Sequence, residues 1–208
     1  MILLSAYTGV MPLTLAGVEF PVVLRPSRPL SDAELLRFGA ANKGLHFERD
    51  KNGELVVMTP TGNRTGMKGM YISRILGNWT DDDGTGYAFD SSTGFSLPDG
   101  SMRCPDAAWV QRSRWDALTE EQKDGFSPIC PAFVIELRSE SDRLPELQNK
   151  MREWVENGSE LAWLIDPSRK AVEVYRPGRE VEVVEDGSAV EGDGPVAGFV
   201  LELGRVWG

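Results

Sequence analysis

The clearest periodic pattern of apolar and polar positions covers residues 141–158, SDRLPELQNKMREWVENG. Its apolar residues recur about every 3.6 positions, the period of a helix that packs one side against a core. These residues are Leu144, Leu147, Met151, Trp154 and Val155. Gly158 is typical of the position just beyond a helix end. The pattern therefore predicts one amphipathic helix over this segment.

A strand is expected directly before this helix, over residues 133–138, FVIELR. Successive side chains of a strand point to opposite faces. Glu136 and Arg138 therefore share one face with Val134, whereas the other face is wholly apolar. This places two opposite charges side by side where apolar residues would be expected.

Further strands are expected after the helix, in ELAWLIDP and AVEVYRPG, and EVEVVED and GFVLELGRVW can add edge strands. The order strand, helix, strand, strand is typical of α/β proteins. The chain is therefore expected to form a mixed β-sheet flanked by helices.

The first half of the chain has clear local signals of its own. Residues 30–44 predict a helix with a capping box, in which Ser31 is the N-cap, Glu34 follows three positions later and Gly44 is the stop. The sequence DKNG at 50–53 lies between two short apolar runs and predicts a hairpin.

The middle of the chain is expected to hold another helix and two strands. Residues 65–84 predict a helix, and residues 85–111 predict two strands around the turn LPDGS. Residues 114–126 predict a short polar helix or a loop. The apolar side chains of the helix, which are expected to pack in the core, are Met67, Met70, Ile75 and Trp79.

Length and composition favour one globular domain, or one domain with a small appendage, because the chain has 208 residues of which 41% are hydrophobic. We expect an extended N-terminal segment over residues 1–30 and one domain over 31–208. No run approaches the roughly 18 consecutive apolar residues of a membrane helix. The start of the sequence lacks a basic leader, and we expect a cytoplasmic protein that binds no membrane.

The formal net charge of −10 argues against a protein that coats nucleic acid through bulk electrostatics, although it leaves room for a small cleft. The charge is uneven along the chain. Residues 55–79 hold three cations and no acid, whereas residues 180–193 hold six acids and no cation. We interpret the acidic run as a solvated hairpin or loop.

The two cysteines, Cys104 and Cys130, each precede a proline, and the chain has a single histidine, His46. This set supports neither a disulfide framework nor a four-ligand zinc site. Both thiols are expected to be reduced and structural.

The candidate chemistry depends on Asp106, at the start of an expected strand, and Glu136. If their strands are neighbours, the two carboxylates converge, and their repulsion favours a hard divalent cation such as Mg²⁺ between them. Arg138 and Lys150 could stabilise charge on a phosphoryl group there. The alternative is an ordinary ion pair between Glu136 and Arg138 on an exposed face, with Lys150 extended to solvent.

Several fragments together resemble one family. PDAAWV, FVIELRS, the helix that contains Lys150 and LAWLIDP look like the arrangement of PD-(D/E)XK nucleases. Together with GELVVMTPTG, LQNKM and VEVYRPG, their order is similar to that of the Uma-two family of bacterial putative restriction endonucleases. The resemblance runs from about Leu30 to the C-terminus.

The resemblance implies a restriction-endonuclease-like α/β fold, with a mixed β-sheet flanked by helices, and hydrolysis of DNA. It implies that Asp106, Glu136 and the Leu137 carbonyl bind Mg²⁺ or Mn²⁺. The lysine position of the pattern falls on Arg138, which can hold charge but can hardly accept a proton. Either Arg138 supplies the charge, or Lys150 replaces the lysine from the helix, or the chain is inactive.

The resemblance also implies a homodimer and a further acidic ligand, Glu54 or Glu48, both of which could equally be surface acids of a hairpin. Asn63, Arg64 and Lys68 could contact DNA phosphates, or could be ordinary solvated residues.

Two other classes of function compete with a nuclease. The first is a catalytically inactive module with the same fold that binds nucleic acid or protein. The second is a glycosidase that uses a carboxylate pair, which fits poorly because such enzymes need no adjacent cations.

Overall fold

The computed structural model describes residues 2–4 and 21–208. These residues form two compact units. The first comprises the chain up to Pro60 together with Gly94–Cys104 and Thr119–Ile129, and the second comprises Thr61–Thr93, Pro105–Leu118 and Cys130–Gly208. The expected boundary between residues 30 and 31 lies within the first unit, and most of the expected N-terminal segment lies outside the described residues.

Six short strands of the described residues form the sheet of the first unit, in the order β1-β2-β4-β3-β7-β6. The strands are β1 (Ile2–Leu4), β2 (Val22–Pro26), β3 (His46–Arg49), β4 (Leu55–Met58), β6 (Phe95–Ser96) and β7 (Met102–Arg103). The helices of this unit are α1 (Asp32–Ala41) and α4 (Glu120–Asp124).

The capping box predicted at the start of α1 is confirmed. The Glu34 amide donates to Ser31 Oγ at 3.4 Å, and the Ser31 amide donates to Glu34 Oε2 at 2.9 Å. The helix ends at Ala41, before the predicted stop at Gly44. The hairpin β3–β4 is confirmed too, with Gly53 at a φ of 82° in its turn.

The second unit contains the predicted mixed sheet, whose described strands run in the order β12-β11-β10-β9-β8-β5. Strands β9 and β10 are parallel, and the remaining neighbours are antiparallel. The strands are β5 (Gly86–Asp90), β8 (Ala107–Gln111), β9 (Phe133–Leu137), β10 (Leu161–Asp166), β11 (Ala171–Tyr175) and β12 (Glu182–Glu185). Two further strands, β13 (Ala189–Glu191) and β14 (Val200–Glu202), pair only with each other.

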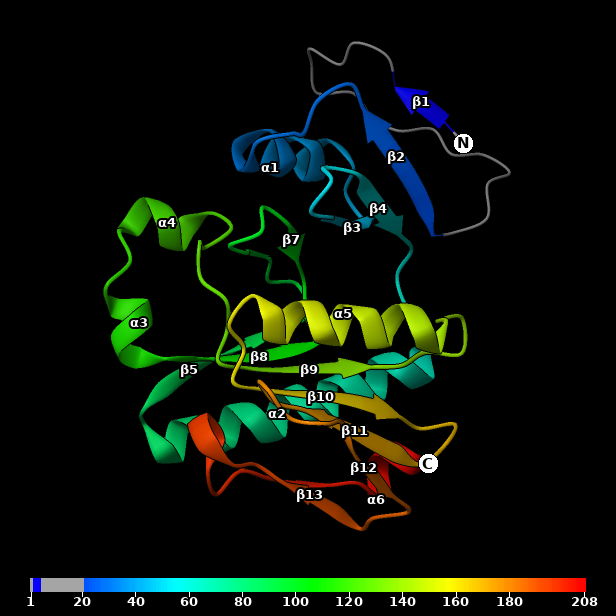
Figure 1. Cartoon of the computed structure of the whole chain (residues 1–208), viewed down its shortest axis with the longest axis vertical. Helices are drawn as coiled ribbons and strands as arrows, with labels where there is room; N and C mark the ends of the chain where they lie inside the picture. The colour runs from blue at the N-terminus through cyan, green and yellow to red at the C-terminus, as the bar shows by residue number, and fades with distance from the viewer. Residues whose placement is uncertain (1, 5–20) are drawn as a thin grey trace. The chain divides into compact units, whose positions relative to one another are not determined.

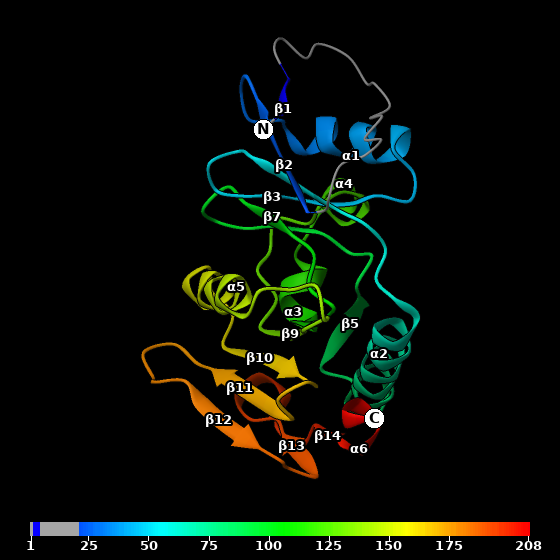
Figure 2. The same ribbon diagram turned by 90° about the vertical axis from the view of Figure 1, so that its right-hand side faces the viewer.

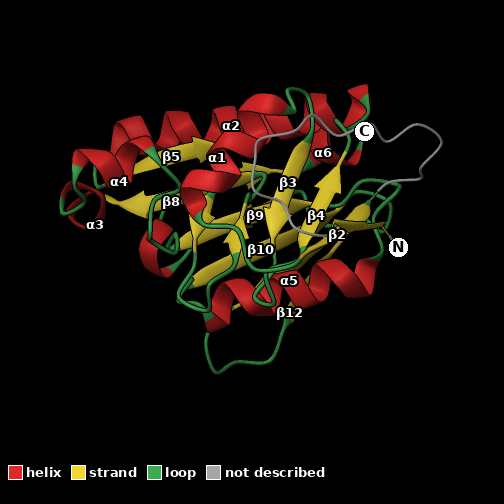
Figure 3. Ribbon diagram, turned by 90° about the horizontal axis from the view of Figure 1, so that it is seen from above, coloured by secondary structure: helices red, strands yellow, loops and turns green. Residues whose placement is uncertain are grey.

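Helices cover both faces of this sheet. The strands lie between α2 (Asn63–Asp83) and α5 (Leu144–Glu156), as the views of Figures 2 and 3 show. The predicted amphipathic helix is α5, and it connects the parallel strands β9 and β10. Short helices complete the unit: α3 (Arg112–Asp116), a 3-10 turn at Gly194–Val196, and α6 (Gly204–Trp207).

The alternation along β9 separates two environments. Phe133, Ile135 and Leu137 belong to the main core together with Ile72 and Leu76 of α2. Side chains of the opposite parity face α5, and this is the side on which Glu136 lies. Every residue of β9 is buried, so neither face of the strand is open to solvent.

Four sequence-based expectations need correction. Met67 and Met70 are 66% and 67% exposed, so they are not core residues. Residues 85–111 form four strands instead of two, because the turn at 97–101 is flanked by strands of only two residues. Residues 114–126 contribute to two short helices rather than one. The end of the chain forms only three residues of strand before α6.

Both cysteines are free thiols, as predicted. Among the described helices, none combines the length and the apolar character needed to cross a membrane.

Candidate active site

The two carboxylates singled out by the sequence lie opposite each other at the junction of β8 and β9. Ala107 pairs with Ile135 in the antiparallel ladder, and one further step in the same register puts Asp106 opposite Glu136. Residues opposite each other in such a pair have Cβ atoms about 4.5–5.5 Å apart on one face of the sheet. The Leu137 amide also donates to Asp106 Oδ2 at 2.7 Å, which holds this carboxylate against β9.

Glu136 is a buried carboxylate, with 4% of its surface exposed. Two donors from α5 reach its Oε1 atom: Lys150 Nζ lies 2.8 Å away and Trp154 Nε1 lies 2.9 Å away. Lys150 and Trp154 are four residues apart, so they lie on the same face of the helix, one turn from each other. A buried charge is costly unless it is paired and hydrogen-bonded, and α5 supplies both requirements.

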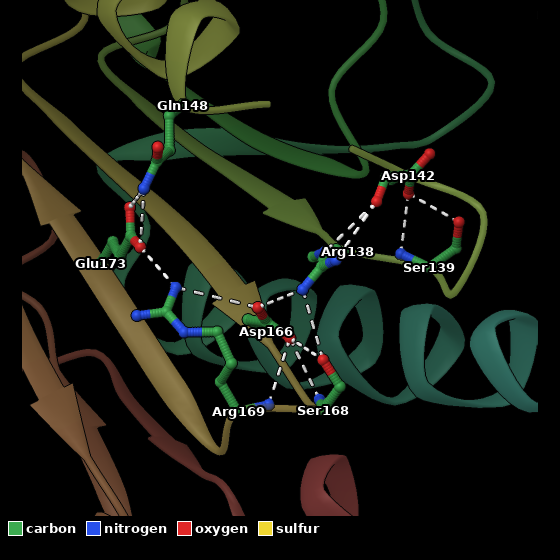
Figure 4. A network of polar contacts seen from close by, with 8 residues as sticks. All are labelled: Arg138, Ser139, Asp142, Gln148, Asp166, Ser168, Arg169 and Glu173. Carbon is green, nitrogen blue, oxygen red and sulfur yellow. Dashed lines mark hydrogen bonds and ion pairs between the residues drawn. The ribbon is translucent and has the colours of Figure 1, made fainter. Parts of the chain in front are cut away.

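Arg138 has a different partner. Its Nη1 atom lies 2.7 Å from Asp166 Oδ2, at the end of β10 (Figure 4). The parallel ladder explains this contact, since Leu137 pairs with Ile165 and the next residues along are Arg138 and Asp166. The alternative of an exposed ion pair between Glu136 and Arg138 is therefore wrong.

Asp166 is the centre of a polar cluster that the sequence analysis missed. It is fully buried, and it accepts hydrogen bonds from the hydroxyl and amide of Ser168 at 2.6 and 3.1 Å. Burial alone would raise the pKa of its carboxyl group. The bonds from Ser168 and Arg138 outweigh burial, so the pKa of Asp166 lies below its ordinary value.

The same cluster continues to Glu173 on β11 (Figure 4). Arg169 Nη1 lies 2.7 Å from Glu173 Oε1, and Gln148 of α5 donates to both carboxylate oxygens at 3.0 Å. Burial opposes the charge on Glu173, but hydrogen bonds led by that from Tyr175 lower the pKa of this carboxyl group. Conversely, burial and the bond to Glu173 raise the pKa of the Tyr175 hydroxyl.

The two candidate acids of the hairpin belong to the first unit and have partners there. Glu48 is 4% exposed and accepts from Arg103 Nη1 and from the Cys104 amide, each at 3.0 Å. Glu54 pairs with Arg25 Nε at 2.5 Å. These bonds give both acids a structural role within their own unit.

The three candidate phosphate contacts, Asn63, Arg64 and Lys68, lie in the first two turns of α2. Arg64 is exposed, and Lys68 is partly buried. Within the described chain neither cation has a carboxylate partner. No side chain caps this helix, because its N-cap is Gly62.

The donors at the junction of β8 and β9 are few, but their oxygen atoms suit a hard cation. Asp106 and Glu136 supply carboxylate oxygens, and Leu137, whose carbonyl is the third predicted donor, follows Glu136 directly. Mg²⁺ is usually bound by one or two carboxylates with waters and substrate oxygens completing its shell, so this set fits Mg²⁺. Among the residues that the structure describes, no three or more His, Cys, Asp or Glu side chains converge on a metal position.

The mixed sheet with α2 and α5 on its faces and the acidic pair at β8 and β9 define a restriction-endonuclease-like α/β protein. The Uma2 family, described as "Putative restriction endonuclease", matches residues 32–204, and the chain belongs to this family. No curated protein matches the sequence.

The solved structures that match this chain include the following two. The crystal structure of a putative nuclease belonging to DUF820 from Anabaena variabilis is 21% identical, with a TM-score of 0.65, and the match covers 77% of this chain and 89% of that one. It shows the same fold. The DrdV–DNA complex is 13% identical over 54% of this chain and 9% of that one, with a TM-score of 0.36.

Proposed function

We propose that the protein is a Mg²⁺-dependent endonuclease that hydrolyses DNA phosphodiester bonds. The observation that carries this proposal is the register of β8 and β9, which sets Asp106 opposite Glu136 while Asp106 is bonded to the Leu137 amide. Membership of a family of restriction-endonuclease-like proteins supports it.

Asp106, Glu136 and the Leu137 carbonyl would hold Mg²⁺ or Mn²⁺. When bound, the cation would act as a Lewis acid, which lowers the pKa of a coordinated water and offsets the negative charge of the phosphate. In the reaction, the water oxygen forms a bond to phosphorus as the bond to one sugar oxygen breaks. The leaving oxygen takes a proton, and the products are a phosphate monoester end and a hydroxyl end.

Lys150 is the better candidate for the cation that stabilises the phosphoryl group. Its ammonium lies 2.8 Å from a candidate metal ligand, whereas the Arg138 guanidinium is occupied by Asp166. Both cations have a carboxylate partner, but the partner of Lys150 is itself a proposed metal ligand, so the Lys150 ammonium already lies at the proposed site, where a cation stabilises developing negative charge. We assign Arg138 the supporting role of fixing the end of β9 against β10.

Trp154 acts in this proposal as a positioning residue for Glu136. Its indole N–H donates to the same carboxylate oxygen as Lys150, from a fully buried ring. Such outer contacts orient metal ligands, and their loss commonly weakens metal binding. The neutral indole would hold the orientation of Glu136 when Lys150 turns toward the phosphate.

Contacts with DNA phosphates are proposed for Asn63, Arg64 and Lys68. Helix α2 begins at the end of the sheet where β9 ends, as Figure 1 shows.

In this proposal the protein works in the cytoplasm as a homodimer, and the exposed Val183 on the edge strand β12 offers one surface for pairing. Light scattering on the purified chain tests the dimer.

The second candidate is a module with this fold that binds nucleic acid without cleaving it. The specific observation in its favour is that Arg138 occupies the lysine position of the strand and is neutralised by Asp166. Binding of DNA without turnover, and no stabilisation by Mg²⁺ on heating, would favour this candidate over the nuclease.

The test of the proposed function is cleavage of plasmid, linear duplex and single-stranded DNA with Mg²⁺ or Mn²⁺. The unmodified protein should cleave at least one form, and Asp106→Asn and Glu136→Gln should each abolish cleavage. Glu156→Gln is a matched control, since Glu156 is an exposed acid on the same helix as Lys150. Equal activity of the two site variants and the unmodified protein would reject the assignment.

A further inference from the structure

Helix α2 has an unusual distribution of charge. Its cations are Arg64, Lys68 and Arg74, within the first twelve of its 21 residues, and its acids are Asp81, Asp82 and Asp83 at the end. The partial charge of a helix is positive at the N-terminus and negative at the C-terminus, so helices favour the opposite order. The arrangement therefore does not serve the stability of α2 itself.

The cations of this helix lack the partners that most buried or half-buried charges of the protein have. Within the described residues, Arg64, Lys68 and Arg74 form no ion pair, and neither does Arg205 of α6. By contrast, Arg49, Arg103, Arg138, Lys150, Arg169 and Arg176 each pair with a carboxylate. In a chain of net charge −10, residues 63–74 of α2 carry three cations and no acid.

Two of these cations converge on one aromatic ring. The guanidinium carbon of Arg74 lies 5.8 Å from the centre of the Tyr71 ring, and that of Arg205 lies 5.6 Å from it. Tyr71 is anchored by a hydrogen bond from its hydroxyl to the Glu202 carbonyl at 3.1 Å. Arg74 belongs to α2 and Arg205 to α6, two helices that are far apart in the sequence. Figure 2 shows that α6 lies next to α2 in the fold. Their mutual repulsion would be relieved by an anion between them.

The spacing of the cations along α2 suits a polymer with regularly spaced negative charges. Arg64 and Arg74 are ten residues apart, which corresponds to about 15 Å along a helix axis. A DNA strand carries one phosphate about every 3.4 Å of its axis, so this length spans several phosphates. The cleft beside Tyr71 is lined by Arg74 and Arg205 and also by Asp186 and Glu202, and among the described residues neither acid forms an ion pair with either arginine.

We infer that Arg74 and Arg205, held over the Tyr71 ring, extend the phosphate contacts of Arg64 and Lys68 into a track that binds the backbone of DNA. This inference builds on the proposed function, because it assigns the same substrate a longer binding surface. Arginine and lysine are the residues that neutralise phosphates in nucleic-acid complexes, and each contact releases counterions.

The test measures DNA binding at several salt concentrations, with all variants in the Asp106→Asn background so that cleavage does not interfere. The variant Arg74→Ala/Arg205→Ala should bind more weakly, and the slope of log K against log salt should become shallower by about 2, since each phosphate contact contributes about 0.9. The control is Lys51→Ala/Arg179→Ala, which removes two exposed cations elsewhere and should leave the slope unchanged.

Equal slopes for the two double variants, or no binding of DNA by any protein, would overturn the track. Titration with inorganic phosphate separates the two sources of the anion, because micromolar binding of free phosphate that is lost in Arg74→Ala/Arg205→Ala would make this a small-molecule site instead. Circular dichroism and thermal unfolding confirm that each variant is folded. If the slope changes as expected while the protein with Asp106 intact cleaves no DNA, the proposed nuclease function fails and the track stands.

Discussion

Lys150 on α5 and Glu136 on β9 form a buried ion pair, with 2.8 Å between the ammonium nitrogen and Oε1. Helix α5 follows β9 along the chain and packs back over it, so the first turns of the helix lie above the end of the strand. The pair places a cation beside a candidate metal ligand.

Replacing Lys150 by Met should lower the rate of DNA cleavage by about a hundredfold or more, the usual effect of removing a donor from a transition state. The matched control is Arg152→Met, because Arg152 is exposed on the same helix and donates only to Asn149 in the described structure. Single-turnover cleavage at saturating Mg²⁺ measures both. Losses of similar size would deny Lys150 a catalytic role.

Replacing Trp154 by Phe removes the neutral donor to Glu136 and should weaken Mg²⁺ binding by about tenfold. Titration calorimetry with Mg²⁺ measures this directly, and the cleavage rate at saturating metal should fall much less. Trp163→Phe is the control, since the indole N–H of Trp163 has no hydrogen-bond partner among the described residues. Equal Mg²⁺ affinities in the two variants would show that Trp154 contributes to core packing and does not position Glu136 for metal binding.

Replacing Arg138 by Met should destabilise the fold by about 3 kcal/mol, because it leaves the buried Asp166 carboxylate without its nearest cation. Denaturant unfolding measures the change. In the double variant Arg138→Met/Asp166→Leu, much of the loss should be recovered, since no unpaired charge remains. If Arg138→Met instead leaves stability intact and abolishes cleavage, Arg138 is the catalytic cation and the assignment to Lys150 is wrong.

The pH dependence of stability should report Asp166 and Glu173, whose pKa values are lowered in the folded protein from the ordinary 3.8 and 4.5. A carboxyl group with a lowered pKa stabilises the fold above its unfolded-state pKa, and this contribution is lost as the pH falls through the folded-state value. Unfolding free energies should therefore decrease below about pH 4.5. The decrease should be smaller in Asp166→Asn. If this variant and the unmodified protein show the same dependence of unfolding free energy on pH, ionisation of Asp166 does not contribute to stability.

Local signals in the sequence were sufficient for the elements that pack along one face. The period of residues 141–158 and the alternation in 133–138 predicted α5 and β9, and the capping box at Ser31 predicted the start of α1. These signals depend on short-range geometry, which a single sequence contains.

Long-range partners could not be predicted in the same way. The sequence indicated that Glu136 and Arg138 share a face, but the parallel register of β9 and β10 gives Arg138 a closer carboxylate in Asp166. A signal existed, since Asp166 ends a strand that is otherwise apolar, LAWLID, and an acid there needs a cation. The exposure of Met67 and Met70 was missed because helical spacing alone does not tell which face is covered.

The most direct test of the central claim is a crystal structure of the protein grown with Mn²⁺, in which anomalous scattering locates the ion. The claim predicts one strong peak between the carboxylates of Asp106 and Glu136, at about 2.1 Å from an oxygen of each, the distance typical of small hard cations. The peak should vanish in Glu136→Gln. A protein that cleaves DNA while its Mn²⁺ lies elsewhere, or an acidic pair that binds no ion at saturating Mn²⁺, would contradict the claim.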